Sequence, residues 1–175
     1  MEMASFSETM GIKNGAFVFR PIQSQDIGQV AILIRTVMTE FGCVGEGYSI
    51  NDPEIDDMHR AYDREGAAFY IIEKEGRILG CGARAPLEGG DGKTCELRKM
   101  YYYPELRGKG WGKKMLKHCL DIAKEKGYSR CYLETVARME QANILYQKMG
   151  FEKSCERFGD TGHGSCESFY VMSLE

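Results

Sequence analysis

The chain has 175 residues, of which 43% are hydrophobic, and this suits one domain with a substantial core. Its net charge of −3 offers no basic surface for nucleic acid, and no apolar run is long enough for a membrane span. No basic segment precedes an apolar one at the N-terminus, so we expect no signal peptide. Seven cysteines without a Cys-x-x-Cys spacing favour reduced thiols, no metal and a cytoplasmic location.

The chain begins with a polar, glycine-containing stretch. Residues 1–15 are predicted to form a loose leader before a single domain of residues 16–175. A strand is predicted at 17–21, and apolar residues then recur with helical spacing over 27–41. Asn51-Asp52-Pro53-Glu54 is typical of a second helix start, because a capping residue precedes a proline and an acidic residue.

Strand-forming residues dominate the middle of the chain. Residues 67–75 and 77–85 are predicted to pair as a hairpin around Glu75-Gly76. A third strand is predicted at 95–103, antiparallel to the hairpin. Pro104 ends this strand, because proline has no N–H to donate to a neighbouring strand.

A glycine-rich loop follows this strand and leads into a helix predicted at 113–126. Glycine stands at three alternate positions where that helix begins, and a helix N-terminus presents unpaired N–H groups with partial positive charge. Basic side chains add full charges at the same place. These features predict a diphosphate-binding site, since an unused glycine cluster would only cost backbone entropy. The residues assigned to it are Arg107, Gly108, Lys109, Gly110, Trp111, Gly112 and Lys113.

Two other phosphate-binding loops do not match this spacing. The dinucleotide fingerprint requires glycine at the position of Lys113. The P-loop requires serine or threonine at the position of Lys114. The loop therefore indicates a phosphate site of another kind.

After the helix the pattern returns to short strands and one more helix. A strand at 131–135 is predicted to lie parallel to the strand at 95–103, because a helix connects them. The remaining predicted elements are a helix at 139–149 and strands at 152–158 and 168–174. This order predicts an α/β (α+β) domain with a mixed sheet.

Three motifs resemble the Gcn5-related N-acetyltransferase (GNAT) family. Arg107-x-x-Gly110-x-Gly112 after a strand is similar to the acetyl-CoA loop of that family. Tyr102-x-Pro104-Glu105 before this loop and Ala142-x-x-Leu145-Tyr146-x-x-x-Gly150-Phe151 after it also resemble the family. The likeness extends from Phe17 to Leu174 and implies one GNAT-like domain, with a mixed central sheet of about seven strands flanked by helices.

The resemblance implies an acetyl-CoA-dependent N-acetyltransferase. Acetyl-CoA would be the cosubstrate, and the acceptor would be the primary amine of a small molecule, an amino acid derivative or a peptide. The acetyl group would pass directly in a ternary complex; Cys95 is the nearest candidate for a nucleophile, and a strand cysteine more often serves packing. The alternatives are a catalytically inactive CoA-binding module and an acyltransferase for longer acyl chains. Whether the chain forms a homodimer is left open.

Amide formation from a thioester needs a base for the amine, donors for the oxyanion and a proton for the thiolate. Two glutamates match base positions of the family: Glu96 on the strand before the loop and Glu134 on the next strand. The alternative for each is a carboxylate that faces solvent or pairs with Arg98 or Lys99. Tyr146 matches the general-acid position of the family, and the alternative is a core tyrosine.

The resemblance assigns the oxyanion donors to the backbone of Met100, Tyr101 and Tyr102. The family often has an asparagine seven residues before the helix tyrosine, where it holds the pantetheine. This chain has Met139 at that position, and Asn143 lies one turn away. Asn143 is therefore included among the residues expected to bind the cofactor.

The acceptor pocket is expected between the first two helices, their connecting loop and the last strands. Residues 46–57 contain many carboxylates, which would suit a cationic amine or else form a solvated acidic face. The segment 161–164, which contains His163, would contribute one polar group to this pocket.

Overall fold

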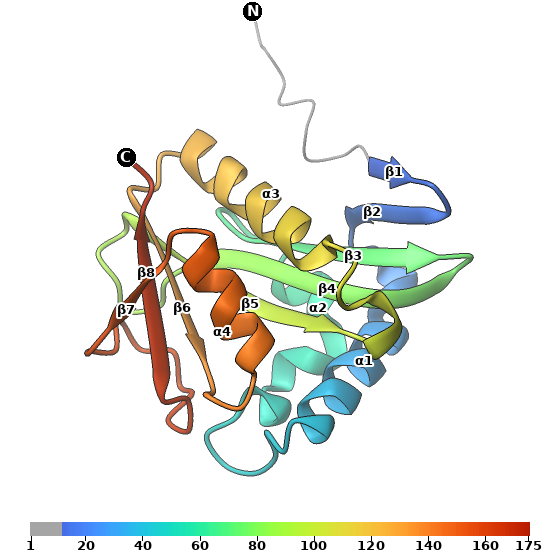
Figure 1. Ribbon diagram of the computed structural model, residues 1–175, viewed down its shortest axis with the longest axis horizontal. Helices are drawn as coiled ribbons and strands as arrows, with labels where there is room; N and C mark the ends of the chain where they lie inside the picture. Colours follow the sequence, from blue (N-terminus) through green and yellow to red (C-terminus); the bar gives the residue numbers. More distant parts are fainter. Residues whose placement is uncertain (1–11) are drawn as a thin grey trace, which may run out of the picture.

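The computed structural model describes residues 12–175. An eight-stranded sheet runs through it in the order β1-β2-β3-β4-β5-β6-β8-β7 (Figure 1). The strands are β1 (Ile12–Asn14), β2 (Phe17–Pro21), β3 (Ala68–Lys74), β4 (Arg77–Pro86), β5 (Thr94–Tyr102), β6 (Arg130–Thr135), β7 (Glu152–Ser154) and β8 (Ser168–Ser173). The β5–β6 pair is parallel, and the other neighbouring strands are antiparallel.

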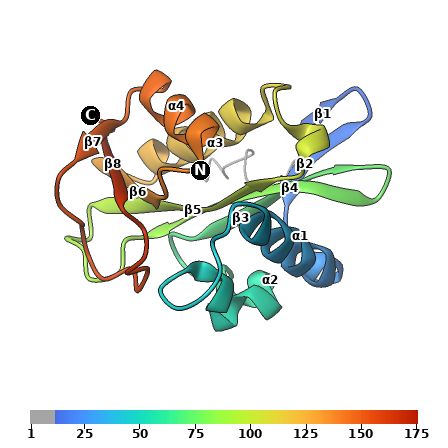
Figure 2. The same ribbon diagram turned by 60° about the horizontal axis from the view of Figure 1, so that its bottom comes forward.

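Helices cover both faces of the sheet. The α-helices are α1 (Ile27–Glu40), α2 (Met58–Ala61), α3 (Trp111–Glu125) and α4 (Glu140–Lys148). Figure 2 shows α1 and α2 on one face and α3 and α4 on the other. Short 3₁₀ turns connect these elements: η1 (Ser24–Asp26), η2 (Ser49–Asn51), η3 (Pro53–Asp57) and η4 (Pro104–Leu106).

Each face of the sheet has its own hydrophobic core. On the α3 side, Trp111, Met115 and Leu116 pack on alternate residues of β5 such as Cys95 and Leu97. On the α1 side, the helix buries residues that recur with its periodicity, and these pack against β3 and β4. The apolar residues of each helix, spaced with its periodicity, therefore pack one helical layer on each face of the sheet.

The predicted α/β domain with a mixed sheet, its hairpin and its parallel pair are confirmed, and three segments differ in detail. The helix predicted from residue 51 is mostly 3₁₀, because Asp57 leaves the helical region (φ −154°) and caps the short α2 by accepting from the Arg60 N–H. The strand predicted at 152–158 ends at Ser154, whose hydroxyl forms a turn with Glu156. Residues 12–14, expected in the leader, pair with β2, and residues 1–11 lie outside the described part of the chain.

An irregularity in β5 shapes the centre of the molecule. Lys99 and Met100 together lie opposite Gly82 of β4, which is a β-bulge, and Lys99 has a left-handed backbone (φ +56°). A Cβ at Gly82 would lie 2.6 Å from the sulfur of Met100, so glycine is needed there. Beyond Glu96, β5 has no further pairing with β6, and the two strands separate.

Candidate active site

Two cavities meet where β5 and β6 separate. The larger, called the α3–α4 cleft, has a volume of about 510 Å³ and is lined by β5, the loop 106–113 and α4. The smaller, called the Glu96 pocket, has a volume of about 70 Å³ and contains residues of β5, β6, the loop around residue 48 and the C-terminal loop. Met100, Tyr101, Met139 and Tyr146 line both cavities, so the two cavities are adjacent.

The N-terminus of α3 opens into the α3–α4 cleft. Gly108, Gly110 and Gly112 line it, and Gly110 adopts a left-handed conformation (φ +80°) as the N-cap without a side-chain cap. The first N–H groups of α3 therefore have no capping side chain, and they carry the positive end of the helix dipole. A Cβ at Gly112 would lie 3.2 Å from Leu145 of α4, so this glycine also allows the close approach of the two helices. The cleft fits an anionic diphosphate at this end.

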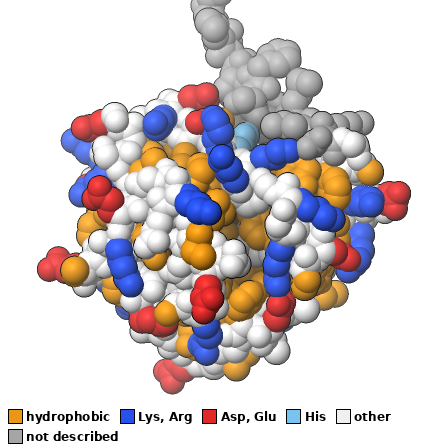
Figure 3. All heavy atoms as spheres, in the orientation of Figure 1, with side chains coloured by type: hydrophobic (Ala, Val, Ile, Leu, Met, Phe, Trp, Pro, Cys, Tyr) orange, Lys and Arg blue, Asp and Glu red, His pale blue; other side chains and the backbone are white. Residues whose placement is uncertain are grey.

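The four basic side chains of the loop have different partners. Arg107 forms two hydrogen bonds of 2.6 and 2.8 Å to Glu40 of α1, and its Nε donates to the Tyr102 carbonyl. Lys109 lies over the ring of Phe17, and Lys114 lies over the ring of Trp111. Lys113 lines the cleft. Arg107 thus fixes the loop to α1, and both Arg107 and Lys113 line the cleft. In the space-filling view of this face, hydrophobic side chains occupy its centre, with Lys and Arg side chains around them (Figure 3).

Glu96 lies on β5 at the point of separation and is 3% exposed. Burial raises the pKa of Glu96 to about 7, although the Arg98 guanidinium acts in the opposite direction. The nearest basic atom, Nε of Arg98, is 3.7 Å from Oε2 of Glu96, which is an ion-pair distance and not a hydrogen bond. Glu96 is therefore a buried carboxylate that can gain or lose a proton near neutral pH.

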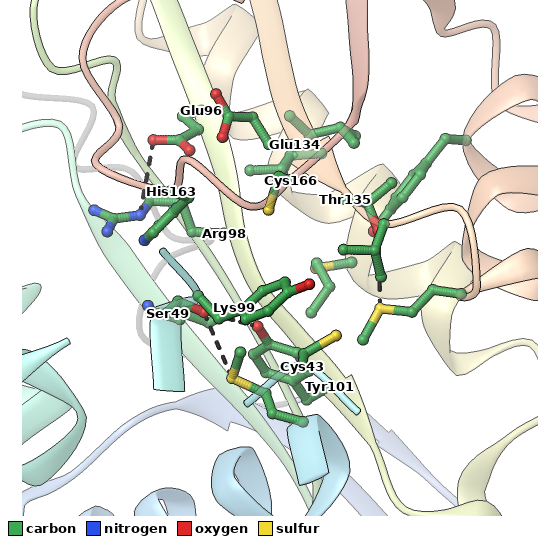
Figure 4. A pocket seen from close by; sticks show the side chains of 18 residues that line it. Cys43, Ser49, Glu96, Arg98, Lys99, Tyr101, Glu134, Thr135, His163 and Cys166 are labelled. Carbon is green, nitrogen blue, oxygen red and sulfur yellow. Dashed lines mark hydrogen bonds and ion pairs between the residues drawn. The ribbon is translucent and has the colours of Figure 1, made fainter. Parts of the chain in front are cut away.

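Glu134 reaches the same end of the pocket from β6, as Figure 4 shows. Its two oxygens accept hydrogen bonds of 2.9 Å from the hydroxyls of Tyr132 and Thr161. The Arg157 Nε is 3.3 Å from the same oxygen that Tyr132 contacts. The oxygens of Glu134 are thus already engaged, and they anchor the C-terminal loop to the sheet.

A charged network closes the other side of the Glu96 pocket. The Lys99 ammonium is 2.6 Å from Asp52 and 3.3 Å from Glu54, and its side chain is only 1% exposed. His163 contacts the same oxygen of Asp52 at 3.0 Å. Burial alone would raise the pKa of Asp52, but the hydrogen bond with His163 and the Lys99 charge lower it to about 2. Asp52 therefore joins β5 to the C-terminal loop.

Tyr146 lies on α4 between the two cavities. Its ring packs near Phe151 and Tyr170, with centroids 6.0 Å apart in each case. Burial raises the pKa of Tyr146, so its phenol is protonated near neutral pH. The side chain is both a core residue and part of the lining of both cavities.

Of the remaining residues expected to bind the cofactor, three line the cleft and Asn143 does not. Met100, Tyr101 and Tyr102 lie beyond the last β5–β6 bridge and line the α3–α4 cleft. Asn143 does not line the cleft: its amide donates to two backbone carbonyls, one of them that of Met139, and accepts from Tyr170. Its hydrogen bonds hold the start of α4, and the Met139 side chain occupies the lining.

Sequence reasoning did not assign Arg98 or Lys99 to the site, and it placed Asp52 there only as one of several carboxylates of an acidic segment. Each was visible only as a charged residue, and the bulge that brings Lys99 beside Arg98 has no signal in the sequence. Within residues 12–175, no set of three or more His, Cys, Asp or Glu side chains is arranged to hold a metal ion. The same part of the chain contains no helix with both the length and the hydrophobicity needed to cross a membrane.

Comparisons with known proteins agree with this arrangement. The model of the acetyltransferase (GNAT) family matches residues 35–151. A protein of Escherichia coli (strain K12) named as the uncharacterized N-acetyltransferase YjgM is 41% identical over 158 residues, which cover 90% of this chain and 95% of the relative.

Solved structures share the fold at low identity. A GNAT-family acetyltransferase from Staphylococcus aureus Mu50 has a TM-score of 0.75 at 19% identity, covering 91% of this chain and all of that one. The PaiA N-acetyltransferase of Thermoplasma acidophilum, solved with coenzyme A, has a TM-score of 0.71 at 18% identity and covers 90% of this chain and 98% of its own. The chain belongs to the GNAT family. It is an acetyl-CoA-dependent N-acetyltransferase.

Proposed function

We propose that this enzyme acetylates the primary amine of a small molecule bound in the Glu96 pocket, with Glu96 as the general base. The observation that carries the proposal is the position of Glu96. It is a buried carboxylate of pKa about 7 in a pocket that shares four lining residues with the α3–α4 cleft. A base of this pKa can accept a proton from an ammonium group near neutral pH.

The surroundings of the two glutamates favour Glu96 over Glu134 as the base. Each oxygen of Glu134 already accepts a hydrogen bond, from Tyr132 or from Thr161, so Glu134 is less able to accept a proton from a substrate. Within residues 12–175, the ion pair of Glu96 is with the Arg98 Nε at 3.7 Å, which is too long for a hydrogen bond. We therefore assign Glu134 a positioning role, in which it holds the C-terminal loop over the pocket.

The α3–α4 cleft is proposed to hold acetyl-CoA. The N–H groups at the start of α3 and the Lys113 side chain would bind its diphosphate, and the three glycines let the backbone approach. The backbone of Met100 and Tyr101, on the edge of β5 that β6 does not pair, would stabilise the oxyanion. Because these residues line both cavities, a thioester carbonyl placed there would meet an amine from the Glu96 pocket.

The proposed reaction balances protons within the site. Glu96 takes a proton from the ammonium, and the neutral amine attacks the thioester carbonyl. The C–N bond forms, the C–S bond breaks, and Tyr146 gives its proton to the departing thiolate. The nitrogen then loses its second proton, which restores the phenol of Tyr146, so one proton in total leaves through Glu96. The raised pKa of Tyr146 ensures that the phenol is protonated before this step. A cytoplasmic location also remains our proposal, consistent with seven cysteines that form no disulfide.

The test is incubation with acetyl-CoA and a panel of amines, amino acids and peptides, while thiol release and the mass of each product are measured. We expect an acetylated product, with thiol release that depends on the acceptor. If acetyl-CoA binds in calorimetry but no member of the panel is acetylated, the proposal is wrong and a catalytically inactive binding module is favoured.

A further inference from the structure

We infer that the acceptor is a small α-amino acid, whose amine meets Glu96 and whose carboxylate is bound by Arg98. The inference rests on the proposed function, because it names the substrate class of the same site. It is carried by four features of the Glu96 pocket: the arrangement of charges on β5, an unsatisfied donor, the pairing of the nearby carboxylates, and the size of the pocket.

The bulge in β5 brings two cations to one face of the sheet. In a regular strand the side chains of Arg98 and Lys99 would point to opposite faces. Because Lys99 is left-handed, both reach the same carboxylate: Glu54 lies 3.0 Å from Arg98 and 3.3 Å from Lys99. Glu96, two residues before Arg98, points to this face as well. One carboxylate and two cationic side chains therefore line one small pocket.

Arg98 has a buried donor without an acceptor. Its Nη2 donates to Glu54, but its Nε forms no hydrogen bond with any residue of the described chain. A buried donor left in this way costs stability, and a bound water, ion or ligand acceptor is one explanation for it. The carboxylate of Glu96 is beside it at 3.7 Å, too far to satisfy it. A molecule with an ammonium next to a carboxylate matches the adjacent Glu96 and Arg98.

The carboxylates near the pocket are already paired, which argues against a polyamine. Asp52 is bound by Lys99 and His163, and Glu54 by Arg98 and Lys99. Asp56 pairs with Arg35, and Asp57 caps α2. Four of the five carboxylates in the acidic segment that suggested a cationic acceptor therefore already have partners, and the cations of β5 would repel a second ammonium.

The size of the pocket restricts the rest of the acceptor. Its volume of about 70 Å³ suits a small molecule, and the C-terminal loop covers it. That loop is held by Thr161 on Glu134, by His163 on Asp52 and by Ser165 on the Glu46 carbonyl. Away from Glu96 and Glu134, the pocket contains Tyr101 and Cys43, where a short side chain could lie (Figure 4).

The experiment compares matched acceptors with the wild-type enzyme and acetyl-CoA. Each set contains an L-amino acid with a short side chain, the amine that lacks its carboxylate, the amino acid amide, and a diamine of similar length. We expect kcat/KM for the amino acid to exceed that of the other three by about tenfold or more. If the simple amine or the diamine reacts as well, the inference is wrong and the proposed function stands. If no acceptor of any class is acetylated, the proposed function itself is wrong.

Variants then test the assigned contact. Arg98→Met should lower the ratio of kcat/KM for the amino acid to kcat/KM for the matched amine by about tenfold or more, while Arg98→Lys should keep part of the preference. Arg77→Met is the control, because Arg77 forms an exposed pair with Glu105 at the far end of β4. An Arg98→Met enzyme that retains the full preference for the amino acid would overturn the inference, and the wild-type comparison decides the question if this variant does not fold.

Discussion

Glu96 and Glu134 lie on neighbouring parallel strands and reach the same end of one pocket, but among the described contacts only Glu134 accepts side-chain hydrogen bonds on both oxygens. Tyr132 and Thr161 donate hydrogen bonds to Glu134. Glu96 is buried, and its described cationic neighbour, Arg98, is 3.7 Å away. Two carboxylates of the same type therefore have different chemistry. The one that is poorly satisfied is the one suited to exchange a proton.

Ionised Glu96 should destabilise the fold. Because burial raises its pKa from 4.5 to about 7, its protonated form stabilises the protein below about pH 4.5, and this contribution is lost as the pH rises to about 7. The shift corresponds to about 3 kcal/mol. Urea unfolding of Glu96→Gln and wild type between pH 4.5 and 8.5 should show the variant gaining relative stability up to about pH 7 and then a constant difference. A difference that is constant from pH 4.5 onwards would mean that Glu96 is ionised throughout.

Tyr146→Phe should distinguish the packing role of this side chain from its role as a proton donor. The ring contacts with Phe151 and Tyr170 are kept, so acetyl-CoA affinity and the melting temperature should change little. The acetyl-transfer step should slow by roughly 10²-fold in single-turnover kinetics. Tyr146→Ala is the contrasting variant, because loss of a buried ring should cost about 3–5 kcal/mol. An unchanged single-turnover rate in the Phe variant would remove Tyr146 from the mechanism.

Gly110→Asp should block the binding of acetyl-CoA. The substitution places a negative charge at the α3 N-terminus where the diphosphate is expected, and it also strains a left-handed residue (φ +80°). Gly76→Asp is a matched control, since Gly76 has φ +78° and equally open space in the β3–β4 turn. Calorimetry should show loss of acetyl-CoA binding only for Gly110→Asp. Equal affinities in the two folded variants would be inconsistent with a diphosphate site at this loop.

Thiol labelling should follow the burial of the cysteines. Cys155 is exposed and Cys166 is half-buried, whereas the other five are buried. In protein kept under reducing conditions, a maleimide reagent should modify Cys155 first and Cys166 more slowly. Denaturation should then reveal all seven thiols, and metal analysis should find no stoichiometric zinc. A count below seven after denaturation would indicate a disulfide or a bound metal.

Much of the fold followed from local patterns in the sequence. The hairpin was predictable because Glu75-Gly76 supplies the two left-handed positions that a tight turn requires (φ +52° and +78°). The N-terminus of α3 was predictable because its glycines precede an amphipathic stretch. Both signals act over a few residues, where the sequence determines the backbone directly.

The site depended on contacts that local patterns do not contain. Lys99 has no sequence feature that indicates a left-handed backbone, yet its bulge places it beside Arg98. The bond from Lys99 to Asp52 spans 47 positions, and that from His163 to Asp52 spans 111. Arg107 remains expected at the phosphate, and its guanidinium also pairs with Glu40, which is 67 positions away. Such pairings depend on tertiary packing, so they could not be assigned from spacing.

The assignment of Glu96 as the base is tested most directly by the pH dependence of acetyl transfer under single-turnover conditions. The rate is measured at saturating acceptor for wild type, Glu96→Gln and Glu134→Gln. The wild-type rate should rise with pH and level off above about pH 7, as expected for a base with the pKa of Glu96. Glu96→Gln should be slower by roughly 10²-fold and lose this rise, while Glu134→Gln should keep the rise at a lower rate. A Glu96→Gln enzyme with the wild-type rate and pH profile would contradict the assignment of Glu96 as the base.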